Sequence, residues 1–307
     1  MFTRQIRLVG IVLLALFMGQ TGAYSAPQDF ANVQIQTEKV ADNVFMLVGA
    51  GGNIGVSVGK DCVFMIDTSY APLADKIKAA IATVSSKPIQ YVVNTHWHQD
   101  HVGGNEYFVK AGATVVAHEN VRKRVSTEQF VKLLNKTVPP LPESALPVIT
   151  FSRNLTFYLN GNEIFIFHIE RAHTDGDAIV HFKKSNVIHM GDIYFNGLYP
   201  YIDISAGGSI NGMIAAVKRI LLLCDQNTKV IPGHGHLSNK AELQEYLKML
   251  VAVRDRINSE IKAGQPLNAV IATRPTRDLD PVWGKGFMKP EQFVTIVYES
   301  LLNEKSH

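Results

Sequence analysis

Three histidines and an aspartate lie within one short segment of this chain, at a spacing that could bind metal. The segment carries His96, His98, Asp100 and His101, with Trp97 and Gln99 between them. Neutral imidazole nitrogens and carboxylate oxygens are ligands that suit zinc and similar divalent ions. An apolar, strand-like run ends at Thr95, so these side chains stand where the backbone turns and can converge. The segment therefore predicts a reaction that depends on metal.

Three further residues of the same chemical types follow other apolar, strand-like runs. His173 follows residues 165–169, Asp192 follows 187–190, and His234 follows 229–231. Loops at strand ends are where layered folds gather the residues of their sites. Together with the first segment, they supply five imidazoles and two carboxylates, enough for two metal ions with open coordination positions.

The sequence predicts short strands and amphipathic helices on both sides of the histidine cluster. Apolar runs predict strands at 34–37, 43–48, 54–58, 62–67, 89–95, 114–117, 155–159, 163–169, 178–182, 187–190 and 229–231. Helical spacing predicts helices from Pro72 to about residue 84, over 119–134, 210–223 and 241–261, and from Pro290 to Leu302. Strand clusters with helices in each half indicate two packed sheets with helices outside, in one domain.

The N-terminus has the composition of a secretory signal peptide. Arg4 and Arg7 precede an apolar run over residues 8–18, and the small residues Ala23 and Ser25 come shortly after it. We expect cleavage next to Ala26, so that residues 1–26 are removed, with an uncleaved N-terminal anchor as the alternative. The protein is then periplasmic or secreted, and no stable membrane anchoring is expected after cleavage.

Composition and charge describe an ordinary globular protein. The chain is 46% hydrophobic and 19% charged, and its formal net charge of +3 gives no reason to propose a nucleic-acid partner. A small-molecule substrate is expected instead, and the sequence leaves the oligomeric state open. Cys62 and Cys224 are its two cysteines; a disulfide and a pair of buried free thiols both remain open.

Downstream motifs make the chain resemble the metallo-β-lactamase superfamily. After the histidine cluster come Ala172-His173-Thr174, Gly191-Asp192 and Pro232-Gly233-His234-Gly235, in that order. The match runs from about Val44 through His236. The resemblance implies an α+β fold, a four-layer αββα sandwich with extra C-terminal helices. Residues 27–307 then form a single domain, with a helical extension from about residue 237.

The resemblance also implies a ligand set for two zinc ions, with iron as the less favoured metal. By this likeness His96, His98 and His173 bind the first metal, Asp100, His101 and His234 bind the second, and Asp192 bridges the two. A hydroxide shared by both ions would be the nucleophile, because zinc lowers the pKa of bound water to about 7. Asp100 can orient that hydroxide and take a proton as it attacks, which makes Asp100 the expected catalytic residue.

Other polar and aromatic residues have weaker assignments. Asp67 resembles the strand-end aspartate that supports the family's site from behind the ligands, and the alternative is a plain turn or helix-cap residue. Asp175 and Asp177 are expected to shape the loop after His173. Aromatic residues near the ligands could line an apolar cleft or belong to the core: Trp97, Phe195, Tyr199 and Tyr201. Histidines outside the ligand set are expected to be structural: His118, His168, His181, His189, His236 and His307.

Residues near Asp192 direct the functional expectation. Lactamases with a cysteine ligand carry it where this chain has Asp192, and they have a nearby lysine, whereas residues 193–195 offer no cation. We therefore expect an exported dinuclear zinc hydrolase that attacks the carbonyl of an ester, thioester, lactone or amide. The alternatives are a metallo-β-lactamase that opens β-lactam rings, a mononuclear iron oxidoreductase resembling persulfide dioxygenases, and a non-catalytic metal-binding protein.

Overall fold

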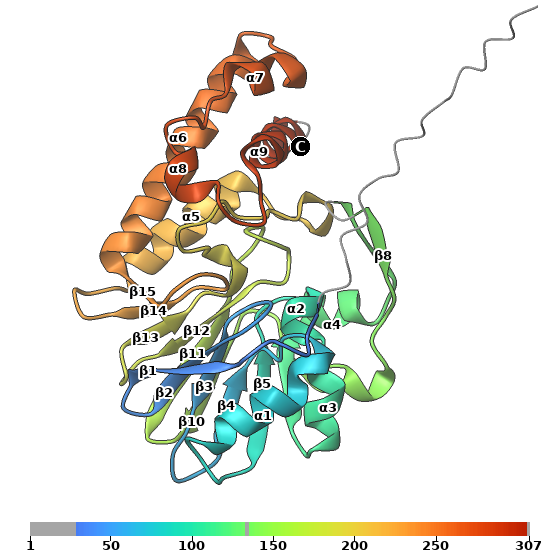
Figure 1. The fold of residues 1–307 in the computed structure, drawn as a ribbon, viewed down its shortest axis with the longest axis vertical. Coiled ribbons are helices and arrows are strands. Elements are labelled where there is room, and N and C mark those ends of the chain that lie inside the picture. The colour runs from blue at the N-terminus through green and yellow to red at the C-terminus, as the bar shows by residue number, and fades with distance from the viewer. Residues whose placement is uncertain (1–28, 133–134, 306–307) are drawn as a thin grey trace, which may run out of the picture.

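The computed structural model describes residues 29–132 and 135–305, and in this part of the chain two β-sheets lie face to face between layers of helices (Figure 1). The predicted signal peptide, residues 1–26, lies outside the described residues. Sheet one has the strand order β1-β2-β3-β4-β5-β6-β9, and sheet two runs from β10 to β15 in sequence order. The four-layer αββα sandwich predicted from the sequence is thereby confirmed.

Sheet one is built from β1 (Gln36–Ala41), β2 (Val44–Val48), β3 (Ile54–Ser57), β4 (Val63–Ile66), β5 (Ile89–Asn94), β6 (Thr114–His118) and β9 (Ile149–Phe151). Its first four strands pair antiparallel, and β4, β5, β6 and β9 pair parallel. Parallel strands end at the same edge of a sheet. The segments that follow β4 and β5, which begin with Asp67 and Thr95, therefore lie side by side, and the amide of Asp67 donates to the carbonyl of Val93.

Sheet two contains β10 (Asn154–Leu159), β11 (Asn162–His168), β12 (Ala178–Phe182), β13 (Val187–His189), β14 (Lys229–Ile231) and β15 (Ser238–Asn239). Strands β13 and β14 pair parallel. The loops after them, which carry Asp192 and His234, therefore leave the sheet at one edge. The loop after β11, which carries His173, leaves at the same edge, because β11 runs antiparallel to β12 and β12 runs antiparallel to β13.

The core between the two sheets follows from the two-residue period of the strands. In β11, Ile164 and Ile166 point between the sheets, whereas Phe165 and Phe167 face the helices on the other side. Strand β12 repeats this alternation: Val180 lies in the intersheet core and Ile179 lies under the helices. Both faces of sheet two are thus buried, which fixes the register of the strands that deliver the ligands.

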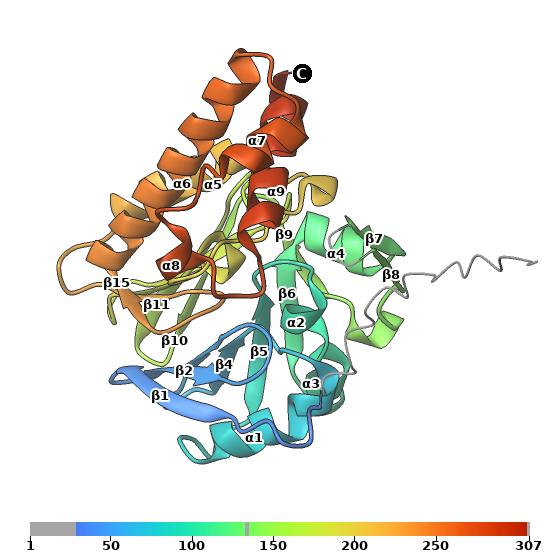
Figure 2. The same cartoon turned by 45° about the horizontal axis from the view of Figure 1, so that its top comes forward.

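Helices cover the outer faces of both sheets (Figure 2). Over sheet one lie α1 (Ala74–Ala82) and α3 (Asn105–Lys110), and over sheet two lie α5 (Ile210–Leu221) and α6 (Lys240–Lys262). The rest of the C-terminal region forms α7 (Leu267–Thr273), α8 (Asp280–Trp283) and α9 (Pro290–Lys305). No described helix is long and apolar enough to cross a membrane.

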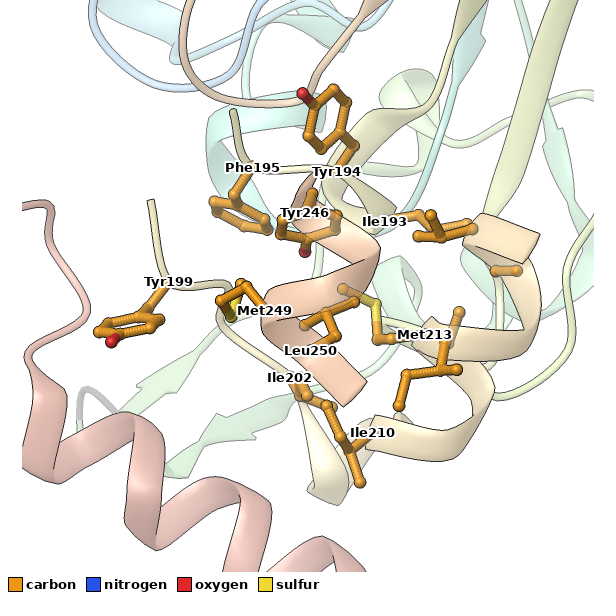
Figure 3. Packing of buried hydrophobic residues seen from close by; sticks show 14 of the residues in the cluster. Ile193, Tyr194, Phe195, Tyr199, Ile202, Ile210, Met213, Tyr246, Met249 and Leu250 are labelled. Atoms are coloured by element: carbon orange, nitrogen blue, oxygen red, sulfur yellow. The ribbon is translucent and has the colours of Figure 1, made fainter. Parts of the chain in front are cut away.

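The C-terminal helices belong to the same packed body as sheet two. Figure 3 shows Met249 and Leu250 of α6 against Met213 of α5, with Ile193 of the loop after β13 beside them. The buried ring of Phe293 in α9 stacks on Tyr199 with 4.6 Å between ring centroids. Residues beyond 237 therefore help to hold the loop that carries Asp192.

One predicted helix is much shorter than the sequence indicated. Helical spacing suggested a helix over 119–134, but α4 (Glu119–Val125) ends at Val125, and a hairpin of β7 (Gln129–Val131) and β8 (Lys136–Val138) follows. The side chains of Ser126 and Thr127 donate to the carbonyl of Lys123, which closes the last turn and competes with further helix. Strand β9 was also absent from the sequence-based prediction.

The two cysteines are buried free thiols. Burial raises the pKa of Cys224 to about 11 and also raises the pKa of Cys62, so both stay protonated at neutral pH. Of the two alternatives left open by the sequence, the structure has the free thiols.

Candidate metal centre

The seven residues predicted as ligands converge where the loops of the two sheets meet. They form two groups, each with its ligand atoms within 4.8 Å of one another. The first group is His96, His98, His173 and Asp192, and the second is Asp100, His101 and His234. This is the division that the sequence predicted, with Asp192 placed by distance in the first group.

In the first group, imidazole nitrogens from both sheets face one another. Nδ1 of His98 lies 2.9 Å from Nε2 of His173. Nε2 of His96 and Nε2 of His173 lie 3.8 Å and 3.6 Å from Oδ2 of Asp192. His96 and His98 belong to the extended segment after β5, so their side chains reach the same side of the backbone.

Asp192 also reaches the second group. Its Oδ1 lies 3.1 Å from Nε2 of His101, and its Oδ2 lies 3.4 Å from Nε2 of His234. Asp100 completes this group, with Oδ2 at 3.3 Å from Nε2 of His234 and 3.7 Å from Nε2 of His101. Asp192 is therefore the one carboxylate with oxygens close to imidazoles of both groups among the seven residues.

Three of these ligand atoms are buried without a hydrogen-bond partner. They are Nε2 of His96, Nε2 of His101 and Oδ1 of Asp192. Buried polar atoms in proteins nearly always have a partner, and an unpaired one needs an explanation. Unpaired buried atoms from two separate segments, distributed over the two ligand groups, fit the binding of metal ions. The nitrogen and oxygen donors are also of the type that zinc takes.

The two ligand groups differ in the pKa values of their histidines. Burial lowers the pKa of His173 to about 4, and it also holds the pKa of His96 well below its ordinary value. Burial acts in the same direction on His234, but the carboxylates of Asp192 and Asp100 outweigh it and raise its pKa to about 9. The pKa of His101 is raised in the same way, against its burial, by Asp192, Asp100 and Asp67.

Asp67 contacts His101 at Nδ1, the ring nitrogen that does not face the second group. Its Oδ2 lies 2.8 Å from Nδ1 of His101 and also accepts from the hydroxyl of Thr95 at 2.7 Å, while its Oδ1 accepts from the amide of Thr95 at 2.7 Å. With Nδ1 engaged in this way, Nε2 is the nitrogen left to face the second group. Asp67 has a positive φ of 64°, an uncommon backbone conformation that turns the chain directly after β4.

Asp203 supports His98, and the sequence analysis did not single it out. Its Oδ2 lies 3.0 Å from Nε2 of His98, which leaves Nδ1 of His98 to face the first group. Its Oδ1 accepts from the hydroxyl of Ser205 and the amide of Ala206. Asp203 caps a short 3-10 helix over Ile204–Ala206, so the only sequence signal was that of a capping aspartate.

Comparison with models of known protein families identifies the family of this chain. The family model of the metallo-β-lactamase superfamily matches residues 48–250, more than half of the chain. The chain belongs to the metallo-β-lactamase superfamily. The resemblance inferred from the sequence motifs is thereby confirmed, and the protein is a metal-dependent hydrolase of this superfamily with a His/Asp metal-binding cluster.

The individual superfamily members that match this chain share only low sequence identity with it. A metallo-β-lactamase type 2 of Elizabethkingia meningoseptica is 23% identical over 246 residues, which are 77% of this chain and 92% of that protein. A hydroxyacylglutathione hydrolase of Polaromonas sp. is 26% identical over 175 residues, which are 55% of this chain and 57% of that protein.

Solved structures of the superfamily share the fold. A metallo-β-lactamase from Pontibacter korlensis superposes with a TM-score of 0.56 at 20% identity. The superposition covers 71% of this chain and 99% of the chain of that protein. The sec-alkylsulfatase Pisa1 from Pseudomonas sp. superposes with a TM-score of 0.64 at 18% identity and covers 86% of this chain and 50% of its own.

Two glycines let the backbone of this superfamily member pass close to the ligands. A Cβ on Gly52 would lie 2.1 Å from Cε1 of His101, and a Cβ on Gly233 would lie 2.1 Å from Oδ1 of Asp192. Gly51, in the same loop as Gly52, has a φ of +83°. Any side chain at Gly52 or Gly233 would displace a ligand.

The aromatic residues near the ligands divide between core and site wall. Phe195 stacks on His234 with 5.0 Å between ring centroids, and Tyr201 stacks on His98 with 5.6 Å. Tyr199 is buried in the core against α9, and Trp97 is buried beside His98. Of the four aromatics, Tyr201 alone is only partly buried.

The loop after His173 is shaped by Asp177, as the sequence indicated. Asp177 accepts from the amides of His173 and Thr174, at 2.6 Å and 2.8 Å. Asp175 instead pairs with Arg124, with two contacts of 2.7 Å. His118 and His168, expected to be structural, stack on each other with 3.7 Å between centroids and belong to neither ligand group.

Asp203→Asn is expected to weaken metal binding at the first group. An amide keeps the shape of the side chain but loses the charge that holds His98, and supporting residues of this kind change metal affinity by about 10–100-fold. A competition titration of zinc against a chromophoric chelator measures this loss. Unchanged affinity for both ions would show that Asp203 only caps its short helix.

Metal binding at the second group is expected to release protons at pH 7, whereas binding at the first group is not. The pKa of His234 is raised to about 9 and the pKa of His101 is raised well above its ordinary value, so both imidazoles are protonated at pH 7, and a metal needs them neutral. Affinity for the second ion should therefore fall as pH falls, by about tenfold per pH unit for each proton displaced.

Calorimetric zinc titrations in buffers of different ionisation enthalpy count these protons. His96 and His173, with lowered pKa values, are neutral at pH 7 and have no proton to release. Equal proton release for the two ions would contradict this assignment.

Proposed function

We propose that this protein is an exported dinuclear zinc hydrolase that cleaves an ester, thioester, lactone or amide. The observation that carries the proposal is the position of Asp192, whose two oxygens lie 3.1–3.8 Å from imidazoles of both ligand groups. A shared carboxylate between two sets of ligands is what a two-metal site requires. Zinc would supply a bound water with a pKa near 7 and would polarise the carbonyl of the substrate.

Some residues of the site are buried, and others are partly exposed to solvent. His96, His101 and His173 are fully buried, so they set the geometry. The side chains of Asp100 and His234 are 21% and 24% exposed and mark the open side where a substrate can approach.

In this proposal Asp100 receives a proton from the attacking water. His101 and His234 hold the pKa of its carboxyl at about 2 despite its burial, so Asp100 is ionised at neutral pH. An ionised carboxylate at the open side of the site can orient an attacking water and accept its proton. This is the role that the sequence predicted for Asp100.

A β-lactamase activity is the second candidate, and the similarity to the Elizabethkingia enzyme favours it. Against it, the segment directly after Asp192 contains no basic side chain. A β-lactam carries a carboxylate that needs a cation, and residues 193–195 supply none.

A substrate panel tests the proposal. Zinc-loaded protein is assayed with p-nitrophenyl esters, a thioester, a lactone and the β-lactam nitrocefin, with the Asp100→Asn variant as the control for contaminating hydrolases. Turnover of esters, thioesters or lactones that disappears in the variant supports the proposal. Turnover confined to nitrocefin would establish the β-lactamase alternative instead.

Export rests on the predicted signal peptide. Expression of the full chain in a bacterial host, followed by fractionation and intact-mass measurement, should find a periplasmic or secreted protein that begins near Pro27. A full-length, cell-retained protein would overturn this part of the proposal.

A further inference from the structure

An apolar cavity lies beside the metal centre, next to the first ligand group. Its volume is about 380 Å³, and it is bounded by the loop from Tyr201 to Ser205 and by helices α7 and α9. Tyr201 and Asp203 form the wall nearest the metal centre. Both residues contact His98, through ring stacking and through the 3.0 Å contact with Nε2. The cavity is therefore one layer of side chains away from a residue of the first ligand group.

Tyr201 and His98 are the side chains that would connect the cavity with the metal centre. The side chain of His98 is 11% exposed, and Tyr201 is partly buried. Their rings are stacked at 28°, so the face of Tyr201 continues from His98 toward the cavity. A molecule that passes along Tyr201 would place one end at the ligands and the other end in the cavity.

Branched aliphatic side chains line the cavity. Ile202 and Ile204 come from the loop after Tyr201, Ile271 comes from α7 and Ile296 comes from α9. Figure 3 shows Ile202 on the loop that leads from Tyr199 to Ile210, next to the helical layer. These side chains come from three separate segments and offer a surface that favours hydrocarbon.

The charged groups at the cavity disfavour an anion. Lys132 is the basic residue of the lining, and its Nζ contacts both carboxylate oxygens of Glu299, at 2.8 Å and 2.9 Å. Asp203 is committed to His98 and Ser205. Glu291 has no ion-pair partner within the described part of the chain. The lining thus provides no uncommitted cation within residues 29–132 and 135–305, and it carries a negative charge.

We propose that this cavity is a substrate subsite for an uncharged hydrocarbon group, and that the enzyme prefers esters, thioesters or lactones with such a group on the acyl side. The statement about the reaction rests on the proposed function, whereas the binding of hydrocarbon does not. Substrates with a carboxylate at the far end of the acyl chain are disfavoured, because the lining carries the negative charge of Glu291 and offers no uncommitted cation among the described residues.

A series of esters tests the preference. The zinc-loaded enzyme is assayed with p-nitrophenyl acetate, butyrate and octanoate, and with the p-nitrophenyl half-ester of octanedioic acid, which matches octanoate in length but ends in a carboxylate. We expect kcat/KM to rise by about two- to fourfold per methylene until the cavity is filled. The half-ester should fall at least about tenfold below octanoate.

Thr295→Trp places a large ring in the cavity. Thr295 lies on α9, is partly exposed and bonds only to a carbonyl of its own helix, that of Glu291. The ratio of kcat/KM for octanoate to that for acetate should fall at least about tenfold in this variant. Leu302→Trp is the matched control, because Leu302 is on the same helix, 40% exposed and outside the cavity. Its ratio should equal that of the unmodified enzyme.

Binding of 1-octanol tests the hydrocarbon subsite separately from the proposed hydrolase activity. Calorimetry with the zinc-loaded enzyme should detect octanol binding that Thr295→Trp removes and Leu302→Trp keeps. If octanol binds in this manner but none of the esters is cleaved, the proposed function fails and the subsite stands. If the esters are cleaved without dependence on chain length, or if Thr295→Trp leaves the ratio unchanged, the subsite is overturned and the hydrolase remains.

Discussion

Asp192→Asn is expected to lower zinc affinity by at least about 100-fold, because even supporting residues of metal sites contribute 10–100-fold. Asp192 is the carboxylate that both ligand groups share, with oxygens 3.1 Å from His101 and 3.6 Å from His173. His101, His234 and His96 overcome its burial and hold its pKa well below the ordinary value, so it is an anion at every working pH. The neutral amide cannot offset the charge of two divalent ions. Zinc content after dialysis and a competition titration measure the loss.

The matched control for Asp192→Asn is Asp42→Asn. Asp42 lies in the turn between β1 and β2 and is fully exposed, so the same chemical change there should leave zinc binding intact. Circular dichroism establishes whether each variant is folded. A folded Asp192→Asn protein that retains two tightly bound zinc ions would contradict the bridging role.

Asp100→Asn is expected to reduce kcat by about 10²–10⁴-fold, the range that proton transfer by a positioned side chain contributes. Asp100 is ionised and stands at the open side of the site, 3.3 Å from His234. An amide of the same size can still contact the second metal but cannot accept a proton. Steady-state assays of the zinc-loaded variant give kcat, and thermal unfolding checks that the fold is kept.

Zinc content distinguishes two explanations for a slow Asp100→Asn enzyme. Two bound zinc ions with a low kcat identify Asp100 as the proton acceptor, whereas one bound zinc ion identifies it chiefly as a ligand. An enzyme with unchanged turnover would refute both roles. Asp42→Asn again serves as the control for the chemical change.

The candidate ligands could be found in the sequence because they lie within a few residues of the ends of apolar strands, and their division between two metals came from the family resemblance. Parallel pairing of β4 with β5 and of β13 with β14 brings strand ends together, so Asp67, His96, Asp192 and His234 meet for reasons that local sequence already contains. The structure adds that the backbone at Gly233, next to His234, passes close to Asp192.

Asp203 could not be predicted because its function depends on a contact between distant segments. It lies 105 residues after His98, in a loop with no ligand of its own. The subsite beside it is equally remote in sequence, since Tyr201, Ile271 and Ile296 meet only through the packing of α7 and α9. Strand β7 was read as part of a helix because short apolar runs suit both structures.

The metal content of the purified protein tests the central claim most directly. Protein purified without chelators and supplied with zinc and iron is analysed by plasma mass spectrometry, and metal-free protein is titrated with zinc while ester hydrolysis is followed. We predict two zinc ions per chain and full activity only after the second equivalent has bound. One iron per chain, with oxygen consumed and no hydrolysis, would contradict the two-metal hydrolase.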